Sequence, residues 1–523
     1  MEKVTDRQLI CEIIALRPET ADDLDSIKRS LAAKYEIPLV SHSTLLRAYK
    51  QLLEDDGKSS DQMLFELLRR RSIRTLSGVA PITVLMKPYP CPGRCVYCPT
   101  EARMPKSYLS SEPAAQRALK NEFDPIRQVK SRMKQLDTNG HTVDKIELIV
   151  LGGTWSFYPH NYQESFMKGC FDAANGFESK TLDEALSANE KAERRIIGVT
   201  LETRPDYVTK DELWRMRRLG CTHIQIGIQS LDQGVLDLVH RDETIEQMAH
   251  ATQLIKQFGF KYTFHIMPGL PGATPKKDLR TFDLLFDHEQ FQPDMLKIYP
   301  TVVVKSSLLY QWWKKGDYKP YDDATLRKLL IEIKKKIPPY VRINRLIRDI
   351  PGNDIIDGNL ITNLRQKMQQ QGARCQCIRC REARSKKVTE QDIEIVERAY
   401  ASCGGTEIFI SFENPDRSTI YAFVRLFLPK KNPSVLGTDT AHVRELHTYG
   451  KLIPVGAKNS AVQHIGFGKR LMKRAEETAK KAGFTKLAVI SGIGVREYYK
   501  KLGYSLDQTY MVKRLTNSAS RPQ

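Results

Sequence analysis

The sequence has no segment suited to a membrane. No apolar run reaches the roughly eighteen residues that span a bilayer, and residues 1–6 lack the basic-then-apolar pattern of a secretory signal. No long basic helix with an aromatic face is present, which disfavours a protein of the membrane surface. These absences predict a cytoplasmic protein without a membrane partner.

Acidic residues are scarce relative to basic ones. The 523 residues include 82 Lys and Arg against 62 Asp and Glu, a formal net charge of +20. This surplus favours a polyanionic partner, nucleic acid first, although a merely basic protein is the alternative. The length predicts two or three domains. Ten clustered cysteines without a secretion signal indicate metal or redox chemistry rather than disulfides.

Three cysteines form one tight motif, and no fourth Cys or His lies within ten residues of it. Cys91, Cys95 and Cys98 have the spacing C-x3-C-x2-C, with Tyr97 before the last. A zinc site needs four ligands, whereas three thiolates can hold three irons of a four-iron, four-sulfur cluster. The fourth iron is then open to S-adenosylmethionine (SAM). The motif resembles that of the radical SAM enzymes, and we predict a [4Fe-4S] cluster at these cysteines.

Residues 1–76 have the pattern of a small helical region. Apolar residues recur there at helical spacing, and Ser41 suits the cap of a third helix. The region ends in four arginines within six residues, Arg69, Arg70, Arg71 and Arg74. Guanidinium groups pair well with phosphate oxygens. The sequence therefore predicts a basic region able to bind the phosphates of a nucleic acid, and a solvated helix end explains the arginines equally well.

Residues 77–350 alternate between short apolar strands and amphipathic helices. Strands are expected at 82–86, 146–151, 196–201, 223–228, 262–266, 295–299 and 341–343. Helices are expected at 114–135, 210–219, 244–258 and 324–337, among others. Such alternation predicts α/β architecture with a parallel sheet. Six or seven units fit an incomplete parallel (β/α) barrel, in which sites gather at the C-terminal ends of the strands.

Glycine-rich or polar residues follow five of these expected strands. They are Gly152 and Gly153, Glu202, Gln229, the Met-Pro-Gly-Leu-Pro-Gly stretch at 267–272, and the pair Lys297 and Tyr299. Two adjacent glycines let the backbone approach a ligand closely. One such strand end is weak evidence, but five in one array downstream of the cysteine motif indicate a ligand site.

Basic and aromatic residues alternate between 312 and 348, with Trp312, Trp313 and Tyr340 among lysines and arginines. This mixture suits an RNA backbone and unstacked bases. Packing in the core would also explain the two tryptophans, and a solvent-exposed helix face would also explain the lysines.

A second cysteine motif lies in residues 351–390, which we interpret as a folded linker. Cys375, Cys377 and Cys380 supply three soft ligands within six residues. A structural zinc ion needs a fourth ligand, which Cys403 or a barrel histidine could supply through space. We predict zinc at this motif, with a second iron–sulfur site or reduced thiols as the alternatives.

Residues 391–523 have the pattern of a compact mixed α+β domain. Strands are expected at 407–412, 420–427, 442–449 and 486–490. Gln463, Gly466 and Gly468 form Q-x-x-G-x-G just before a helix expected at 468–482. Free amides at a helix start bind phosphate well. The motif resembles the pyrophosphate loop of the GCN5-related acetyltransferases.

Together these motifs are similar to those of the catalytic subunit of Elongator. That family fuses a radical SAM domain to an acetyltransferase domain and makes the carboxymethyl group on carbon 5 of the wobble uridine, position 34, of tRNA. The resemblance runs from about residue 80 to the C-terminus. It rests on the cysteine loop and on residues 152–154, 202–207, 297–301, 348–351, 444–449 and 491–504.

The resemblance implies an acyltransferase, a tRNA uridine(34) acetyltransferase, that depends on radical SAM chemistry and acetyl-CoA. Lys297 and Tyr299 are candidates to hold the substrate or intermediate, and Tyr499 to protonate the thiol. The residues expected at SAM are Gly152, Gly153, Glu202 and Gln229. The residues expected at acetyl-CoA are Glu445, Leu446, His447 and Thr448 along the pantetheine arm, then Gln463, Gly466, Phe467, Gly468, Lys469 and Tyr499.

Two other functions fit parts of the sequence. One is a protein lysine acetyltransferase with a structural iron–sulfur domain. The other is a tRNA-binding assembly subunit with a structural cluster. The complete cysteine loop and the SAM motifs disfavour both. The sequence leaves open the electron donor, the tRNAs used, and whether the chain acts alone, as a homodimer or within an Elongator-like assembly.

Overall fold

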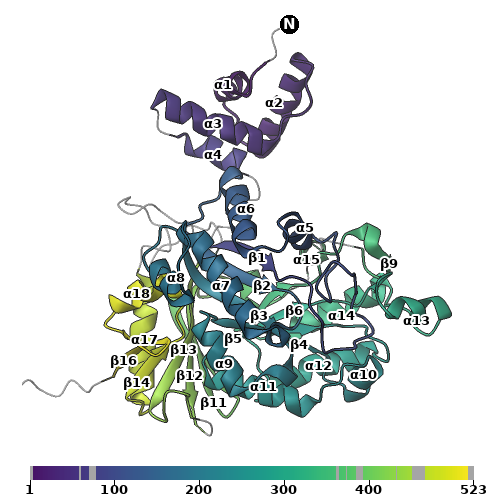
Figure 1. Cartoon of the computed structure of the whole chain (residues 1–523), viewed down its shortest axis with the longest axis vertical. Helices are drawn as coiled ribbons and strands as arrows, with labels where there is room; N and C mark the ends of the chain where they lie inside the picture. Colours follow the sequence, from purple (N-terminus) through teal and green to yellow (C-terminus); the bar gives the residue numbers. More distant parts are fainter. Residues whose placement is uncertain are drawn as a thin grey trace, which may run out of the picture.

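A computed structural model describes residues 4–57, 60–69, 78–360, 364–370, 372, 374–383, 393–430, 433–449 and 466–515. A small helical domain stands above a parallel sheet wrapped by helices, and a second sheet lies beside the first (Figure 1). Within the described residues, no helix is both long and apolar enough to cross a bilayer.

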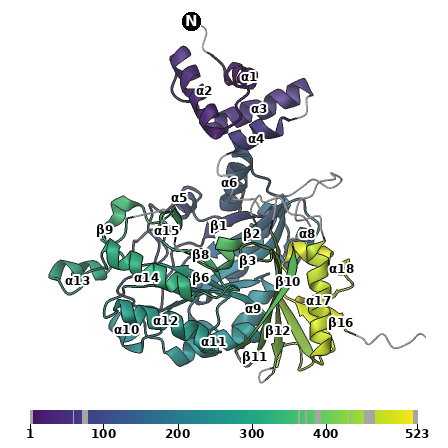
Figure 2. The same cartoon turned by 180° about the vertical axis from the view of Figure 1, so that it is seen from behind.

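The N-terminal domain consists of α1 (Asp6–Leu16), α2 (Ala21–Lys34), α3 (His42–Asp56) and α4 (Gln62–Leu68). Their apolar faces bury one small core that includes Leu9, Leu24 and Leu46. The Ser41 side chain caps α3 by accepting from the Thr44 amide, as predicted. The domain projects from the rest of the molecule in both views (Figures 1 and 2).

The arginine cluster is only partly described. Arg69 donates to Glu66 across 2.8 Å, while Arg70, Arg71 and Arg74 lie outside the described residues. The RNA-binding role of this cluster therefore stays a prediction.

Seven parallel strands form the central sheet in the order β1-β2-β3-β4-β5-β6-β8. They are β1 (Ala80–Leu85), β2 (Lys145–Leu151), β3 (Arg195–Thr203), β4 (His223–Gln229), β5 (Lys261–Ile266), β6 (Met295–Ile298) and β8 (Arg342–Arg345). Each matches a predicted strand to within a few residues. The expected incomplete parallel barrel is confirmed.

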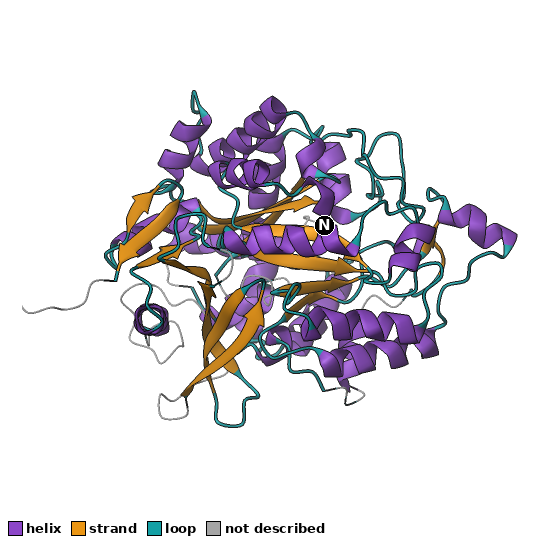
Figure 3. Ribbon diagram, turned by 90° about the horizontal axis from the view of Figure 1, so that it is seen from below, coloured by secondary structure: helices purple, strands orange, loops and turns teal. Residues whose placement is uncertain are grey.

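Helices pack on the outside of this sheet (Figure 3). They are α5 (Pro113–Lys120), α6 (Pro125–Thr138), α7 (His160–Asn175), α8 (Leu182–Asn189), α9 (Lys210–Arg218), α10 (Gln233–Leu238), α11 (Ile245–Gln257), α12 (Pro275–Asp287), α13 (Leu309–Lys315) and α14 (Asp323–Lys336). The buried core between the helices and the sheet is rich in Ile, Leu, Val and Phe.

The prediction of one helix over residues 114–135 is wrong, because α5 ends at Lys120 and α6 begins at Pro125. Glu122 and Phe123 have φ of 53° and 57°, in the left-handed region. The ring of Pro125 disfavours helical backbone at the residue before it. Asp124 then caps α6 by accepting from the Arg127 amide.

The second sheet has the order β10-β11-β12-β13-β14-β16-β15. Its strands are β10 (Glu394–Ser402), β11 (Gly405–Glu413), β12 (Ile420–Pro429), β13 (Thr440–Thr448), β14 (Lys486–Val489), β15 (Ser505–Asp507) and β16 (Tyr510–Arg514). Helices α17 (Phe467–Lys481) and α18 (Arg496–Lys500) complete this domain. The predicted α+β domain is confirmed, although β10, β15 and β16 were not foreseen.

The connecting residues pack against both domains. They contain β9 (Ile355–Asp357), which pairs with β7 (Val303–Val304), and the helices α15 (Leu364–Gln370) and α16 (Ile378–Arg381). The Ile378 amide donates to the Val341 carbonyl at the barrel, and the Ala383 amide donates to Ile420 of the second sheet.

The second domain is seated on the N-terminal ends of the barrel strands. The Arg444 guanidinium on β13 donates to both carboxylate oxygens of Asp294, just before β6, at 2.5 and 2.9 Å. Glu407 on β11 accepts from Arg444 and pairs with Lys256 of α11 at 2.9 Å. All four side chains are fully buried. Removing one partner from a buried network of this kind is strongly destabilising, so the two domains are held in one fixed arrangement.

Candidate active site

One continuous cavity of about 1470 Å³ runs along the interior of the barrel. Its lining includes Cys91, Cys95 and Cys98, which follow the C-terminal end of β1. It also includes residues 445–448 of β13, Tyr449 just after them, and residues 498–499 of α18, at the opposite end of the strands. The two groups of predicted site residues therefore share one enclosed space.

The cysteine loop lies next to two buried arginines. Arg241 donates to the Cys95 sulfur across 3.6 Å, and Cys91 lies 3.8 Å from the Thr154 hydroxyl. A hydrogen bond from Cys98, then the charge of Arg241, lowers the pKa of Cys95 to about 4, against the effect of burial. The thiolate is the form that binds metal, so the loop favours an iron ligand at Cys95.

The surroundings of the loop fit an anionic cluster. Arg204 pairs with Asp206 at 3.0 Å and with Glu243 at 2.9 Å. Its remaining nitrogen, Nη1, is buried and has no hydrogen-bond partner within the described part of the chain. A Cβ at Gly93 would lie 2.3 Å from that nitrogen. An unpaired buried donor is costly, and a cluster held by three thiolates would supply the missing negative charge.

The predicted SAM residues surround the same end of the cavity. Gly153 lines it with φ of 88°, which favours glycine, whereas Gly152 packs against Met86. Gln229 also lines it, has φ of 69°, and has a buried Oε1 without a hydrogen-bond partner among the described residues. Strained residues of this kind gather at ligand sites. The Glu202 carboxylate is fixed by the Tyr108 hydroxyl, which donates to it at 2.8 Å.

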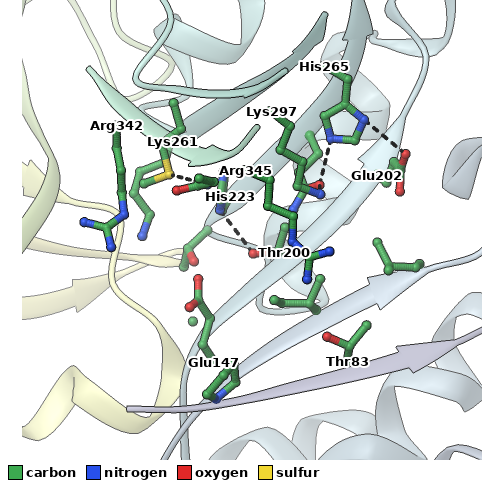
Figure 4. A pocket seen from close by; sticks show the side chains of 18 of the residues that line it. Thr83, Glu147, Thr200, Glu202, His223, Lys261, His265, Lys297, Arg342 and Arg345 are labelled. Carbon is green, nitrogen blue, oxygen red and sulfur yellow. Dashed lines mark hydrogen bonds and ion pairs between the residues drawn. The ribbon is translucent and has the colours of Figure 1, made fainter. Parts of the chain in front are cut away.

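Lys297 on β6 and Tyr299 just after it line the cavity, as does Glu202. Lys297 donates to the Gln225 side-chain oxygen, which also lies 2.9 Å from His265 Nε2 (Figure 4). Burial lowers the pKa of Lys297 to about 8 and raises the pKa of the Tyr299 phenol. The site thus brings together an ammonium group that loses its proton more readily than usual and a protonated phenol.

The barrel interior between the two ends is polar, which the sequence reasoning missed. Thr83, Glu147, Thr200, His223 and Lys261 line it (Figure 4). His223 lies 3.1 Å from the Thr200 hydroxyl, and burial lowers its pKa to about 3. Complete barrels usually fill this space with branched apolar side chains. The alternation of polar and apolar residues along β4 and β5 was the available signal, because period two places alternate residues on one face.

The acetyl-CoA residues predicted on β13 lie where two strands separate. β13 pairs with β14 only from Thr440 to Val443. Glu445, Leu446, His447 and Thr448 lie beyond this pairing and line the cavity. Their backbone groups on that side are not used by β14, so they can pair with an extended amide-bearing ligand. Burial lowers the pKa of His447 to about 4, which keeps the imidazole neutral.

The start of α17 completes this end of the cavity. Gly466 caps the helix with φ of 70°, and Gly466, Gly468 and Lys469 line the cavity. The free amides of a helix N-terminus favour phosphate. Phe467 instead buries its ring in the core, 4.4 Å from the ring centre of Phe412, so only its backbone is available to a ligand. Gln463 lies outside the described residues.

Tyr499 on α18 lines the cavity beside Tyr498 and is 6% exposed. Burial raises the pKa of its phenol. A protonated phenol at this position can donate a proton to a leaving thiolate.

The second cysteine motif is compact. The sulfurs of Cys375, Cys377 and Cys380 all lie within 4.8 Å of one another, and no other potential ligand joins the group within the described ranges. Cys403 does not join it, since its thiol donates to the Gln290 carbonyl at 3.4 Å. The expectation that Cys403 is a fourth ligand is therefore wrong.

Comparisons with known proteins agree with this geometry. The Radical SAM superfamily profile matches residues 89–285, and the Radical_SAM C-terminal domain profile matches residues 293–373. A "tRNA uridine(34) acetyltransferase" of Methanocaldococcus infernus is 40% identical over 512 residues, covering 94% of this chain and 95% of that protein. Human "Elongator complex protein 3" is 37% identical over 519 residues, covering 94% and 93%.

A solved structure is similar as well. Archaeal Methanocaldococcus infernus Elp3 with an N-terminal deletion superposes with a TM-score of 0.73 at 38% identity, covering 84% of this chain and 99% of that one. The chain therefore belongs to the family of radical SAM enzymes that contains the tRNA uridine(34) acetyltransferases and Elongator complex protein 3.

Proposed function

We propose that this enzyme modifies the wobble uridine of tRNA by joining the acetyl group of acetyl-CoA to carbon 5 as a carboxymethyl group. The names of its relatives support tRNA as the substrate. The observation that carries the proposal is the shared cavity, because its lining includes both the cysteine loop and the predicted acetyl-CoA residues.

The overall reaction joins the acetyl methyl carbon to carbon 5 of uracil. One hydrogen leaves each carbon, and water then hydrolyses the thioester to release CoA. The reduced cluster with SAM would supply a carbon radical that removes one hydrogen atom; the other hydrogen would leave as a proton, and its electron would pass to a one-electron acceptor such as the oxidised cluster. The protein contributes placement and the exclusion of water.

Cys91, Cys95 and Cys98 would hold the cluster, with Arg204 and Arg241 beside it. At the same end, Gly153 offers its backbone to SAM, and the fixed Glu202 carboxylate and the unpaired Gln229 oxygen offer acceptors for its amino and hydroxyl groups.

Lys297 and Tyr299 are the proposed substrate contacts. As an ammonium group, Lys297 can donate to a carbonyl oxygen of uracil or of the thioester, and the Tyr299 phenol can do so from the same strand end. Donors held in a site with little water stabilise charge that develops on such oxygens.

Acetyl-CoA would enter from the other end. The unpaired backbone of Glu445–Thr448 would bind its amides, the α17 start with Lys469 its pyrophosphate, and Tyr499 would protonate the departing thiolate. The barrel strands have up to nine residues, or about 30 Å at about 3.3 Å per residue. An extended pantetheine arm can cover much of that length.

The compact triad of Cys375, Cys377 and Cys380 is proposed to bind zinc. Tetrahedral ligands at about 2.3 Å from zinc lie about 3.8 Å apart, which the observed cluster of sulfurs can accommodate. A fourth ligand would complete the site.

The decisive experiment is mass spectrometry of tRNA nucleosides after anaerobic incubation with reconstituted enzyme, reductant, SAM and acetyl-CoA. We expect carboxymethyluridine only when all three small molecules are present. Acetyl-lysine formed on added protein without SAM would instead identify a protein acetyltransferase and would overturn the proposal.

A further inference from the structure

Helix α13 projects from the side of the molecule opposite the acetyltransferase domain (Figures 1 and 2). The cavity lining includes Val302 and Val304 but no residue from 305 to 321. The helix therefore lies outside the space assigned to uridine, SAM and acetyl-CoA.

The inner side of α13 packs directly on the cysteine loop. The Leu309 amide donates to the Val96 carbonyl at 2.8 Å. Leu309 shares one apolar cluster with Cys95, Val96 and Tyr97, and Trp312 packs against it. Since an α-helix with its side chains is about 10 Å across, only one helix separates the loop from solvent here.

A groove of about 390 Å³ lies beside α13 and has Trp312 in its lining. Leu238, Pro271, Trp312 and Tyr318 give this groove an apolar lining. Leu238 is 46% exposed, and the nearby Leu308 is 50% exposed. Apolar side chains gathered at the surface in this way indicate a contact site.

Lysines surround this apolar surface. Residues 305–321 contain Lys305, Lys314, Lys315 and Lys319, all exposed, against one acid, Asp317. Lys314 lies 5.6 Å from the Tyr310 ring centre. Of the neighbouring acids, Asp322 caps α14, Asp237 accepts from Gln233, and Asp357 accepts from the Trp313 indole of α13 at 2.8 Å. The segment therefore presents a net positive rim to a partner.

We propose that this α13 face, consisting of Leu238, Pro271, Leu308, Trp312, Lys314, Lys315 and Lys319, docks an acidic one-electron carrier protein of the ferredoxin or flavodoxin type. Electron-transfer contacts are small and weak, and opposite charges raise their association rate. The carrier loses one electron and the cluster gains it, with no bond made or broken. The electron passes through the Trp312–Leu309 packing into the Cys95–Cys98 loop. This inference rests only on the radical SAM part of the proposed function.

The same lysines and tryptophans would suit RNA by composition. The tryptophans, however, pack against the apolar cluster that contains the cysteine loop, outside the cavity lining, and this placement favours an electron carrier instead.

The test compares two reductants on the cluster-loaded, full-length protein. The variant Lys314→Glu/Lys315→Glu/Lys319→Glu is reduced anaerobically either by reduced flavodoxin or by dithionite, and the loss of cluster absorbance is followed by stopped flow. We expect flavodoxin-driven reduction to slow by about tenfold or more, because steering by charge is lost. Dithionite-driven reduction and iron content should not change, which also shows that the variant is folded.

A matched control, Lys473→Glu/Lys480→Glu/Lys481→Glu, reverses the charge of three exposed lysines on α17. It should leave the rates of reduction by flavodoxin and by dithionite unchanged. The wild-type rate with flavodoxin should also fall as salt concentration rises. Equal flavodoxin rates in the α13 variant and wild type would overturn the proposal. So would a loss of tRNA affinity at an unchanged flavodoxin rate, which would assign the face to RNA. Cluster reduction is measured without tRNA. The test of the docking face therefore stands even if the enzyme proves not to modify uridine.

Discussion

The two cysteine triads use the same ligand atom in different surroundings. Cys91, Cys95 and Cys98 line a large cavity beside two arginines, and their sulfurs do not form a compact group. Cys375, Cys377 and Cys380 bring their sulfurs within 4.8 Å of one another beside the barrel core. A single ion draws thiolates together, whereas a four-iron cluster spreads them. The difference shows that the same three-cysteine composition takes two geometries, and under the proposed function the open triad holds the iron–sulfur cluster and the compact triad holds zinc.

The largest expected effect comes from Cys95→Ala. Losing one of three iron ligands should reduce cluster absorbance and SAM cleavage to background, while Tm changes little by comparison. The exposed Cys11 offers a control, since Cys11→Ala removes a thiol from neither triad. Retained uridine modification in Cys95→Ala would contradict the assignment of this triad.

The opposite pattern is expected for Cys377→Ala. Its side chain is fully buried beside the barrel core, so losing a structural metal there should lower Tm by about 5 °C or more. Zinc content, measured by elemental analysis, should fall while iron per chain is retained. If iron falls instead, the second triad holds iron and the contrast between the triads is lost.

A smaller effect is expected for Gly93→Ala. The new Cβ would lie 2.3 Å from Arg204 Nη1 and would displace that donor from the loop. We expect a few-fold lower cluster occupancy after reconstitution, measured as iron per chain. Gly352→Ala is the control, since a Cβ there meets nothing within 4 Å; equal occupancy in the two variants would remove the role assigned to Arg204.

The smallest effect concerns pH. Burial lowers the pKa of Lys297 to about 8, so the ammonium group is mostly present at pH 7 and is lost as pH rises through about 8. If that charge binds a substrate oxygen, KM should rise several-fold between pH 7 and 9. Lys297→Met should raise KM at pH 7 and abolish this pH dependence. A wild-type KM that is flat over this range would assign Lys297 a purely structural role.

The sequence predicted the barrel well because its strands are apolar runs that end in polar or glycine-rich motifs. Those ends predicted that Gly153, Glu202, Lys297 and Tyr299 lie together, and all four line the cavity. β10 was missed because its sequence, Glu-Ile-Val-Glu-Arg-Ala-Tyr-Ala-Ser, has no regular alternation of apolar and polar residues, and most of its side chains remain accessible.

Other parts of the site depend on contacts that no local pattern encodes. Arg241 reaches Cys95 from 146 residues away, and Arg444 reaches Asp294 from 150 residues away. The polar barrel interior, likewise, connects the two groups of site residues only because the second domain packs at the N-terminal ends of the strands. Long-range assembly of this kind follows from tertiary packing rather than from propensity.

The seating of the second domain on the N-terminal ends of the strands has a kinetic consequence. Under the proposed function, SAM and acetyl-CoA would load from opposite ends of one passage, so neither would obstruct the other. Initial-rate kinetics should then show random-order binding, with each compound leaving the Kd of the other nearly unchanged. CoA and the spent SAM fragments would leave independently, by the ends at which their parent molecules entered.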